Sequence, residues 1–213
     1  MAVPSIKMKK KYEAFFGSHI KIIELHVDVP EEYKYLRSDE EYEKIDFLIA
    51  GVAAGGRKGH TAALSAFSKF MNEYYKGHED DYREFSLSFI GLGKDYLSAQ
   101  LKNIGVDVLG KRFTYSPTVS RSSALKQMNK CNAVICCSLM EAFGLYIAEG
   151  MYMGHVVLRN DCSGIDEQRK PGKNGLEIQD NGLDQFAQAI ELELNKTKMT
   201  KHQLKQQGAP HEE

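Results

Sequence analysis

The sequence has 213 residues, of which 42% are hydrophobic and 27% charged, and its formal net charge is −1. These values are typical of a globular chain and exclude a disordered protein, a collagen and a coiled coil. The near-zero net charge also lacks the excess of Lys and Arg that is typical of a protein that coats nucleic acid, so we expect no nucleic-acid partner. At roughly 100–200 residues per domain, the length fits one domain with a short extra element.

The chain has no predicted membrane span, leader or metal site. Its longest apolar run, residues 47–56, is far short of the roughly 18–20 residues that cross a bilayer. The start, MAVPSIKMKKKYEAFF, has no apolar core after its lysines and does not fit a signal peptide. We expect reduced, buried cysteines and a cytoplasmic protein, because no C-x-x-C pair or histidine at zinc-ligand spacing accompanies Cys131, Cys136, Cys137 and Cys162.

The first 44 residues differ from the rest. Residues 7–16 form a lysine-rich amphipathic stretch that predicts a helix, and residues 20–25 predict a strand. Residues 28–44 are acidic and rich in tyrosine, and their apolar residues recur with neither helical nor strand spacing, which predicts an irregular connector. A solvated helix face is the favoured interpretation of the lysines at 7–11, with peripheral contact to anionic lipid as the alternative. We expect residues 1–44 to be a linker helix and connector.

From residue 45 onward, short apolar runs alternate with amphipathic stretches. The predicted strands are residues 46–52, 85–91, 106–113, 133–138, 155–159 and 175–178. The predicted helices are residues 60–75, 94–104, one that begins near Ser120, 145–153 and 183–194. This alternation predicts an α/β fold, a doubly wound parallel sheet of Rossmann-like type, over residues 45–195. Residues 196–213 are predicted to be a polar tail.

Ligands of such sheets bind beyond the carboxyl ends of the strands, and the first loop there is residues 51–59, GVAAGGRKG. Its small residues, including Gly55 and Gly56, allow a ligand to approach the backbone closely. Arg57 and Lys58 open the following helix, where unbonded N–H groups already favour an anion. A flexible turn with solvated cations explains this loop equally well, and its spacing does not match a Walker A loop.

The second loop, Gly91-Leu92-Gly93, follows the next strand. A dinucleotide fingerprint would need a third glycine at position 96, which is Tyr96. A plain strand-to-helix turn is therefore the favoured interpretation of this loop.

The third loop, residues 138–150 (SLMEAFGLYIAEG), follows the most apolar strand and opens a helix. Backbone amides at Phe143, Gly144 and Leu145 could hold phosphate oxygens there. Glu141 would face whatever is attached to the phosphate, and Glu149 could accept hydrogen bonds from two ribose hydroxyls. A helix-dipole role explains Glu141 alone, but it explains Glu149 poorly, because Glu149 lies in an apolar stretch.

At these residues the sequence resembles the retaining glycosyltransferases of family 4, the group 1 type. Glu141 and Glu149 form the E-x7-E pattern around Phe143-Gly144-Leu145. The Arg57-Lys58-Gly59 element, the Gly91-Leu92-Gly93 turn, Gly164-Ile165-Asp166-Glu167 and Lys173-Asn174-Gly175-Leu176 are similar to further family motifs. The resemblance covers about residues 5–195 and concerns the C-terminal, donor-binding half of a two-domain GT-B enzyme.

The resemblance implies a nucleotide-diphosphate sugar as donor substrate, no metal and no other cofactor. It implies a glycan or lipid-linked acceptor bound by an N-terminal domain, with poor transfer by this half alone. Arg57, Lys58 and Glu141 would be catalytic. The donor would be bound by Gly55, Gly56, Gly91, Gly93, Ala142, Phe143, Gly144, Leu145 and Glu149.

The sequence also departs from that pattern. Val52 stands where the family usually has an arginine, and Cys137, His155 and Asp166 replace common prolines. A non-catalytic sugar-nucleotide binding or interaction module is therefore the main alternative. An NAD-dependent dehydrogenase and a nucleotide-sugar epimerase are further alternatives.

Overall fold

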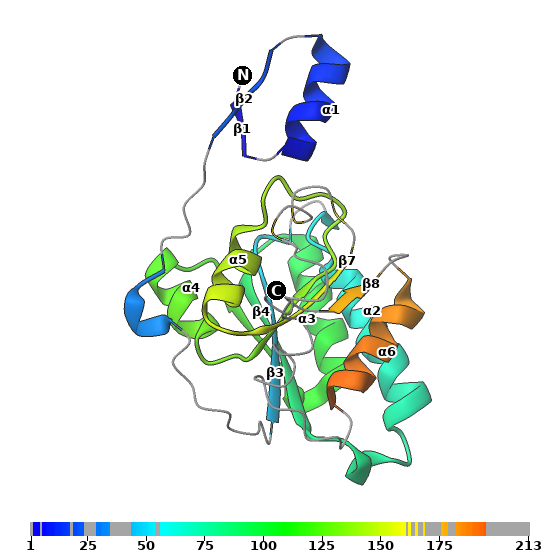
Figure 1. Cartoon of the computed structure of the whole chain (residues 1–213). Helices are drawn as coiled ribbons and strands as arrows, with labels where there is room; N and C mark the ends of the chain where they lie inside the picture. The colour runs from blue at the N-terminus through cyan, green and yellow to red at the C-terminus, as the bar shows by residue number, and fades with distance from the viewer. Residues whose placement is uncertain are drawn as a thin grey trace, which may run out of the picture.

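The computed structural model describes residues 2–4, 6–17, 19–23, 29–34, 44–53, 56–160, 162, 165, 168, 176–178 and 182–194. The strands and helices named below lie within these residues. Six of the strands form one sheet, and two short strands pair separately near the N-terminus (Figure 1).

The six-stranded sheet is parallel and has the order β5-β4-β3-β6-β7-β8. Its strands are β3 (Lys44–Ala50), β4 (Glu84–Leu92), β5 (Phe113–Pro117), β6 (Ala133–Cys136), β7 (Val156–Asn160) and β8 (Leu176–Ile178). Counted along the chain, this is the order 3-2-1-4-5-6 of a doubly wound Rossmann-like fold, so the predicted fold class is confirmed. The strand order reverses between β3 and β6, and this is where such folds bind their ligands.

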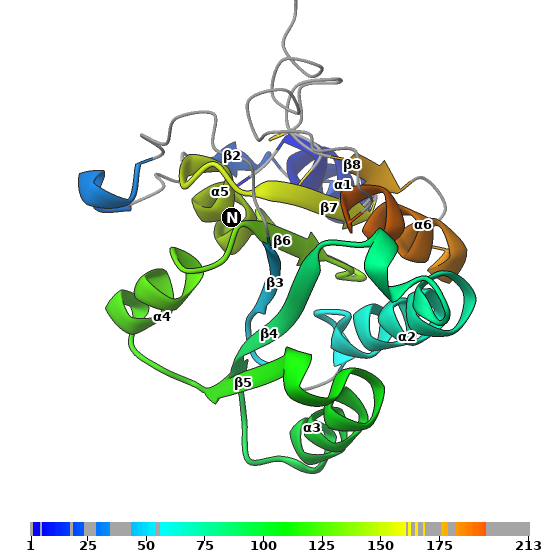
Figure 2. The same cartoon turned by 90° about the horizontal axis from the view of Figure 1, so that it is seen from below.

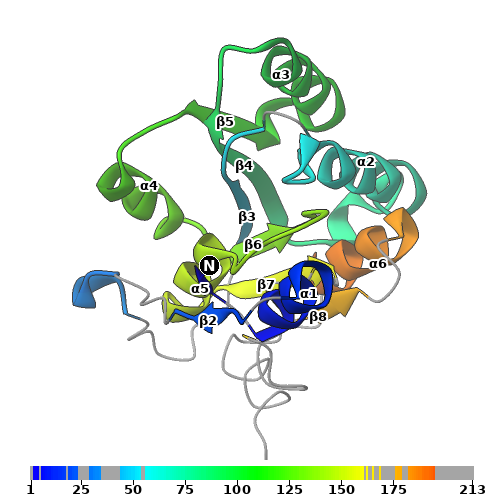
Figure 3. The ribbon, with the colours of Figure 1, turned by 90° about the horizontal axis from the view of Figure 1, so that it is seen from above.

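Helices cover both faces of the sheet (Figures 2 and 3). One face carries α2 (His60–Phe70), extended by a π-helical turn Met71–Tyr75, together with α3 (Tyr96–Leu109) and α6 (Leu183–Leu194). The other face carries α4 (Arg121–Met128) and α5 (Leu145–Tyr152). Successive side chains of β3 point to opposite faces: Phe47 packs in the core under α2, whereas Leu48 packs with Ile147 of α5. Both faces of the strand are buried, which explains its continuous apolar run.

One predicted element is wrong. Residues 106–113 were expected to be a strand, but α3 continues to Leu109, a 3-10 turn follows at Gly110–Arg112, and the strand β5 begins at Phe113. Leu101, Gly105 and Leu109 are buried at helical spacing. A Cβ at Gly105 would lie 2.3 Å from the ring of Phe113, so the glycine lets the strand pack against the helix. The valines at 106 and 108 are part of a helix that tertiary packing stabilises.

The N-terminal residues form a small unit of their own. Strands β1 (Ala2–Val3) and β2 (Lys21–Ile22) are parallel and are joined by helix α1 (Ile6–Phe16), which lies beyond the main body in Figure 1. Its core consists of Val3, Met8 and Ile20, with Tyr12 packed against it. The predicted helix and strand are therefore present, although residues 24 and 25 lie outside the described part. A 3-10 turn, Glu31–Tyr33, follows within the predicted connector, and another, Glu79–Asp81, precedes β4.

Candidate functional site

The loop after β3 packs directly against the end of β6. Gly59 has φ +74° and forms the N-cap of α2 in the left-handed region, which favours glycine. A Cβ at this position would lie 2.0 Å from the carbonyl oxygen of Cys137, so only glycine fits here. The loop thereby brings Arg57 and Lys58 to the point where the strand order reverses. Gly55, predicted for the same site, lies outside the described residues, and Gly56 (φ +68°) precedes the two cations.

Backbone hydrogen bonds join this loop to the loop after β6. The Leu139 N–H donates to the carbonyl of Arg57 at 2.9 Å. In return, the Arg57 guanidinium donates from Nη1 to the carbonyl of Met140 at 3.1 Å. Arg57 is exposed, so its guanidinium is accessible from solvent while its backbone carbonyl is held by Leu139. The two loops form one connected rim at the carboxyl edge of the sheet.

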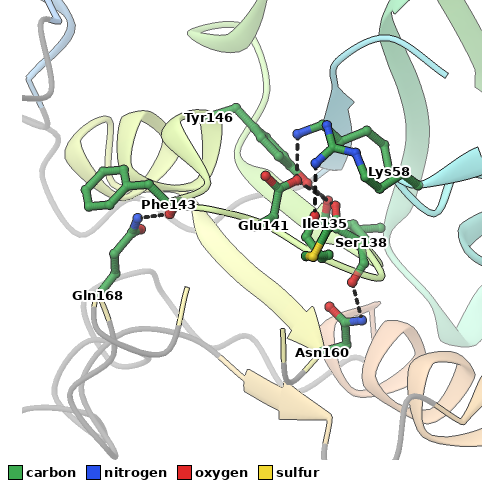
Figure 4. Close-up of polar contacts among 10 residues, drawn as sticks. Lys58, Ile135, Ser138, Glu141, Phe143, Tyr146, Asn160 and Gln168 are labelled. Carbon is green, nitrogen blue, oxygen red and sulfur yellow. Dashed lines mark hydrogen bonds and ion pairs between the residues drawn. The ribbon is translucent and has the colours of Figure 1, made fainter. Parts of the chain in front are cut away.

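Across this rim, Lys58 and Glu141 form a partly buried ion pair (Figure 4). Lys58 Nζ lies 2.5 Å from Glu141 Oε1, and the exposed fractions of the two side chains are 17% and 6%. Ser138 Oγ donates to the same carboxylate oxygen at 2.8 Å. Lys58 Nζ also lies 5.6 Å from the centre of the Tyr146 ring. The pair fixes two of the predicted catalytic side chains beside each other.

The third feature is the start of α5, at Gly144. This N-cap residue has φ +76° and ψ 55° and, being glycine, has no side chain to cap the helix. Because the first N–H groups of a helix lack partners within it, and because the helix dipole is positive there, this end favours an anion. A Cβ at Gly144 would lie 2.9 Å from Ile165 Cγ1, so glycine is required by both space and conformation. The adjacent carbonyl of Phe143 accepts a hydrogen bond from Gln168 Nε2 (Figure 4).

Glu149 lies just over one turn into α5 and is paired with a residue that sequence reasoning missed. Its Oε1 lies 2.6 Å from Arg121 Nη1, although Arg121 belongs to the first turn of α4. The exposed fractions are 49% for the Arg121 side chain and 6% for Glu149. A single arginine at a helix start forms no motif, so no signal in the sequence could have found this contact.

Gly91 and Gly93, the remaining predicted glycines, serve different roles in the structure. Gly91 (φ +99°) approaches the first loop so closely that a Cβ would lie 3.2 Å from Gly51, whose N–H donates to the Ile90 carbonyl at 2.9 Å. At Gly93, a Cβ would lie 2.6 Å from Asp95 Oδ2. Asp95 caps α3 by accepting a hydrogen bond from the Ser98 N–H at 3.0 Å, so Gly93 makes room for a helix cap.

Two buried side chains at the site have shifted pKa values. Burial is the main cause that lowers the pKa of His60 to about 4, with the charge of Lys58 adding to it and the Gly51 backbone opposing it. With this pKa, His60, the first residue of α2, is neutral at pH 7. Burial also raises the pKa of Tyr146 well above its usual value. Its hydroxyl donates to the Ile135 carbonyl at 3.0 Å and ties α5 to β6 (Figure 4).

Some predicted motif residues cannot be placed. Residues 164, 166, 167 and 173–175 lie outside the described part of the chain. A hollow of about 340 Å³ lies on the α4 face of the sheet, lined by Asp46, Ser86 and Ser116 among others, and none of the predicted site residues lines it. Among the residues that the structure describes, no three His, Cys, Asp or Glu side chains are grouped as metal ligands. The described helices include none with the length and apolar character of a bilayer span.

Comparisons with known proteins show the family and the fold of the chain. The model of the family described as "Glycosyl transferases group 1" matches residues 34–209. No curated protein sequence matches the chain.

Three solved structures illustrate the similarity in fold. A glycosyltransferase from Rickettsia africae ESF-5 is 18% identical with a TM-score of 0.70, and the match covers 97% of this chain and 57% of that one. A mutant of S. aureus TarM, in complex with Fondaparinux, alpha-GlcNAc-glycerol and UDP, is 14% identical with a TM-score of 0.73 and coverages of 97% and 39%. A sucrose-phosphate synthase from Thermosynechococcus elongatus is 18% identical with a TM-score of 0.66 and coverages of 90% and 48%. The chain therefore spans about half the length of these proteins or less.

Proposed function

Because this chain belongs to the group 1 glycosyl transferases, we propose that residues 45–195 bind the nucleotide-diphosphate sugar donor of a glycosyl transfer. The observation that carries this proposal is the meeting of three features at the strand-order reversal: the cations of one loop, Glu141 of the next loop, and the uncapped start of α5. Such a rim offers positive charge and amide donors to a diphosphate, with a carboxylate beside it for sugar hydroxyls.

In this proposal each residue has a distinct role. The amides at Ala142 to Leu145 and the guanidinium of Arg57 bind the diphosphate. Lys58 and Glu141 lie next to it, where Lys58 stabilises the leaving diphosphate and Glu141 accepts hydrogen bonds from the sugar. Glu149 accepts hydrogen bonds from the ribose. Gly56, where an added Cβ would meet nothing within 4 Å, leaves the backbone of the rim open to the ligand. Gly91 and Gly93 act indirectly: Gly91 lets the second loop pack against the first, and Gly93 makes room for the cap of α3.

We further propose that transfer retains the anomeric configuration and needs no metal ion, because the cations and the helix start meet the charge that develops on the leaving group. The acceptor would be a glycan or a lipid-linked glycoconjugate, handled in the cytoplasm by a second α/β domain. Support for a second domain comes from the N-terminal unit, since β1, α1 and β2 form a parallel β-α-β unit outside the main sheet. It leaves Phe15 81% exposed, an apolar surface that such a domain would cover. We expect this chain alone to transfer sugar poorly.

A non-catalytic sugar-nucleotide binding module is the second candidate. Val52 favours it, because this side chain is 50% exposed at the rim where related sequences usually carry an arginine. Binding of the donor without any transfer, even when an acceptor domain is supplied, would support this second candidate.

Calorimetric titration of the chain with a nucleoside and with its diphosphate tests donor binding. We expect the diphosphate to bind and the nucleoside to bind much more weakly. Arg57→Ala should lower affinity for the diphosphate by about tenfold, a charged hydrogen bond being typically about 1.5–3 kcal/mol, and leave the nucleoside unaffected. Lys126→Ala removes an exposed cation from α4 and serves as the control. Equal losses for both ligands would contradict a phosphate role for Arg57.

A further inference from the structure

A buried asparagine, Asn160, lies at the carboxyl end of β7 and belongs to none of the motifs found in the sequence. It is the last residue of the strand and is 4% exposed. Its Nδ2 donates to the Ser138 carbonyl at 2.8 Å (Figure 4). Its Oδ1 is buried and has no hydrogen-bond partner among the residues that the structure describes. A buried amide with an unused acceptor costs free energy, so stability alone does not explain an asparagine here.

The bond from Asn160 extends the contact between two strands by one side chain. The backbone pairing of β6 with β7 ends at Cys136 and Arg159. Beyond that pair, the Asn160 amide reaches the carbonyl of Ser138, the second residue after the end of β6. On its other side Asn160 pairs with Ile178 of β8, so the amide is carried by a strand that has a neighbour on each side. The loop after β6 is therefore tied to a rigid part of the sheet.

Ser138 passes this restraint on to the ion pair of the rim. It is buried, and while its carbonyl accepts the bond from Asn160, its Oγ donates to Glu141 Oε1 at 2.8 Å. Lys58 Nζ contacts the same Oε1 atom from the loop after β3. Because Ser138 is held through both its backbone and its side chain, it is a fixed anchor for the carboxylate. These contacts form a relay that joins the carboxyl ends of three neighbouring strands, β7, β6 and β3.

We propose that Asn160 is a positioning residue of the candidate site: its amide holds Ser138 so that Ser138 keeps the Glu141 carboxylate against Lys58. The consequence for the ligand rests on the proposed function, in which Glu141 binds the sugar and Lys58 stabilises the leaving diphosphate. Without the amide, the anchor of the carboxylate moves, the sugar loses a partner of defined position, and the Lys58 ammonium becomes more accessible.

Asn132 provides a matched control for a purely structural role. Like Asn160, it is a buried asparagine whose Nδ2 donates to a backbone carbonyl at 2.8 Å, in this case that of Lys44. It also accepts a bond from the Asp46 N–H at 2.8 Å. Asn132 directly precedes β6 and so lies at the opposite edge of the same sheet. Asn132→Ala should therefore cost at least as much stability as Asn160→Ala without affecting the rim.

Acetylation of lysines with the N-hydroxysuccinimide ester of acetic acid, followed by mass spectrometry, tests the positioning without any ligand. In Asn160→Ala, the rate at Lys58 relative to the exposed Lys126 should rise about fivefold, as expected for the loss of one hydrogen bond. Asn132→Ala should keep the wild-type ratio. Ser138→Ala should raise the ratio as well, and adding Asn160→Ala to it should have little further effect, because both changes release the same anchor. Thermal unfolding of each variant checks that the fold is retained.

Three results would overturn the positioning role. One is an Asn160→Ala protein with the wild-type rate at Lys58. Another is an equal rise in Asn132→Ala, which would mean that the rate follows a general loosening of the sheet. The third is a double variant whose rise is the product of the two single rises, because Asn160 would then not act through Ser138.

Calorimetry with UDP and UDP-glucose, and with GDP and GDP-mannose, tests the consequence for the donor. In the pair that the wild type binds, Asn160→Ala should weaken the sugar nucleotide about threefold more than the diphosphate, because the change reaches the sugar through Glu141. Equal losses for both members of the pair would overturn the link to the sugar. If the wild type binds neither pair, the proposed function fails, while the acetylation rates still decide whether Asn160 positions the ion pair.

Discussion

Lys58 Nζ and Glu141 Oε1 lie 2.5 Å apart, and this ion pair joins two loops that are 83 residues apart in the sequence. The contact arises because the strands that carry the loops, β3 and β6, are neighbours in the sheet. Taking opposite charges out of water is favourable only when their hydrogen bonds are satisfied, and Ser138 supplies one such bond at 2.8 Å. The same carboxylate places a negative charge beside the proposed anion site, so it should weaken the binding of a diphosphate there.

Glu141→Gln should strengthen the binding of a nucleoside diphosphate, by about 1 kcal/mol or roughly fivefold. The reason is that the amide keeps hydrogen-bonding capacity but removes the negative charge beside the diphosphate and leaves the charge of Lys58 unopposed. Transfer from the corresponding nucleotide sugar should fall, because the sugar loses its carboxylate partner. Calorimetry with the diphosphate and an activity assay measure the two effects. Glu84→Gln, at the opposite edge of the sheet, is the control, and weaker diphosphate binding by Glu141→Gln would contradict the placement of the anion.

Gly59→Ala should prevent stable folding or cost several kcal/mol of unfolding free energy. A Cβ there would lie 2.0 Å from the Cys137 carbonyl oxygen, and backbone cannot move aside as a flexible side chain can. Gly56→Ala is the matched comparison, since Gly56 has a similar φ of +68° but nothing within 4 Å of the added atom. It should cost only about 1 kcal/mol of backbone strain. Urea unfolding of both proteins measures the difference, and equal losses would show that the two loops are not packed as described.

Much of this fold follows from sequence patterns. The apolar runs that became β3, β4 and β6 predicted a doubly wound sheet, and the loops after them were correctly expected at one edge. The strand expected at residues 106–113 was wrong, because two valines suggested a strand where buried Leu101, Gly105 and Leu109 continue the helix. The sequence placed Lys58 and Glu141 on facing loops but could not show their direct contact, which depends on rotamers and on the neighbouring loop backbone. Arg121 had no signal at all, since its partner lies on another helix.

The stabilising contribution of the neutral, buried His60 should decrease in acid. Its pKa is lowered from 6.5 to about 4 in the folded state, chiefly by burial, so the unfolded state binds the proton more readily between these values. Stability from this residue is complete above pH 6.5 and declines as the pH falls toward 4. The loss at pH 5 should be about 2 kcal/mol relative to about pH 7. His60→Phe, which keeps an aromatic ring at the position 4.8 Å from the Phe89 ring, should remove this dependence.

Urea unfolding at pH 5 and pH 7 measures the effect of His60. His78→Gln, at an exposed histidine before β4, is the control, and its unfolding free energy should differ between pH 5 and pH 7 as in the wild type. A His60→Phe protein whose unfolding free energy depends on pH as in the wild type would mean that His60 does not titrate on unfolding in this range.

Glu193 should lower the unfolding free energy as the pH rises, whereas His60 raises it. Burial raises its pKa from 4.5 to about 7, against a smaller opposing effect of Arg83, so the folded state holds the proton that the unfolded state has released. Its unfavourable effect is absent below pH 4.5 and grows until the pH has passed 7. Between pH 5 and 7 its effect is about 2 kcal/mol and nearly cancels that of His60, so the wild type should show a flatter stability profile than a variant that lacks either residue.

Glu193→Gln should raise the unfolding free energy by about 2–3 kcal/mol more at pH 8 than at pH 5, because the neutral amide has no charge to bury. Glu191→Gln, on the same helix at a half-buried position, is the matched control in urea unfolding at both pH values. Equal gains for the two variants would show that the gain does not come from the burial of Glu193.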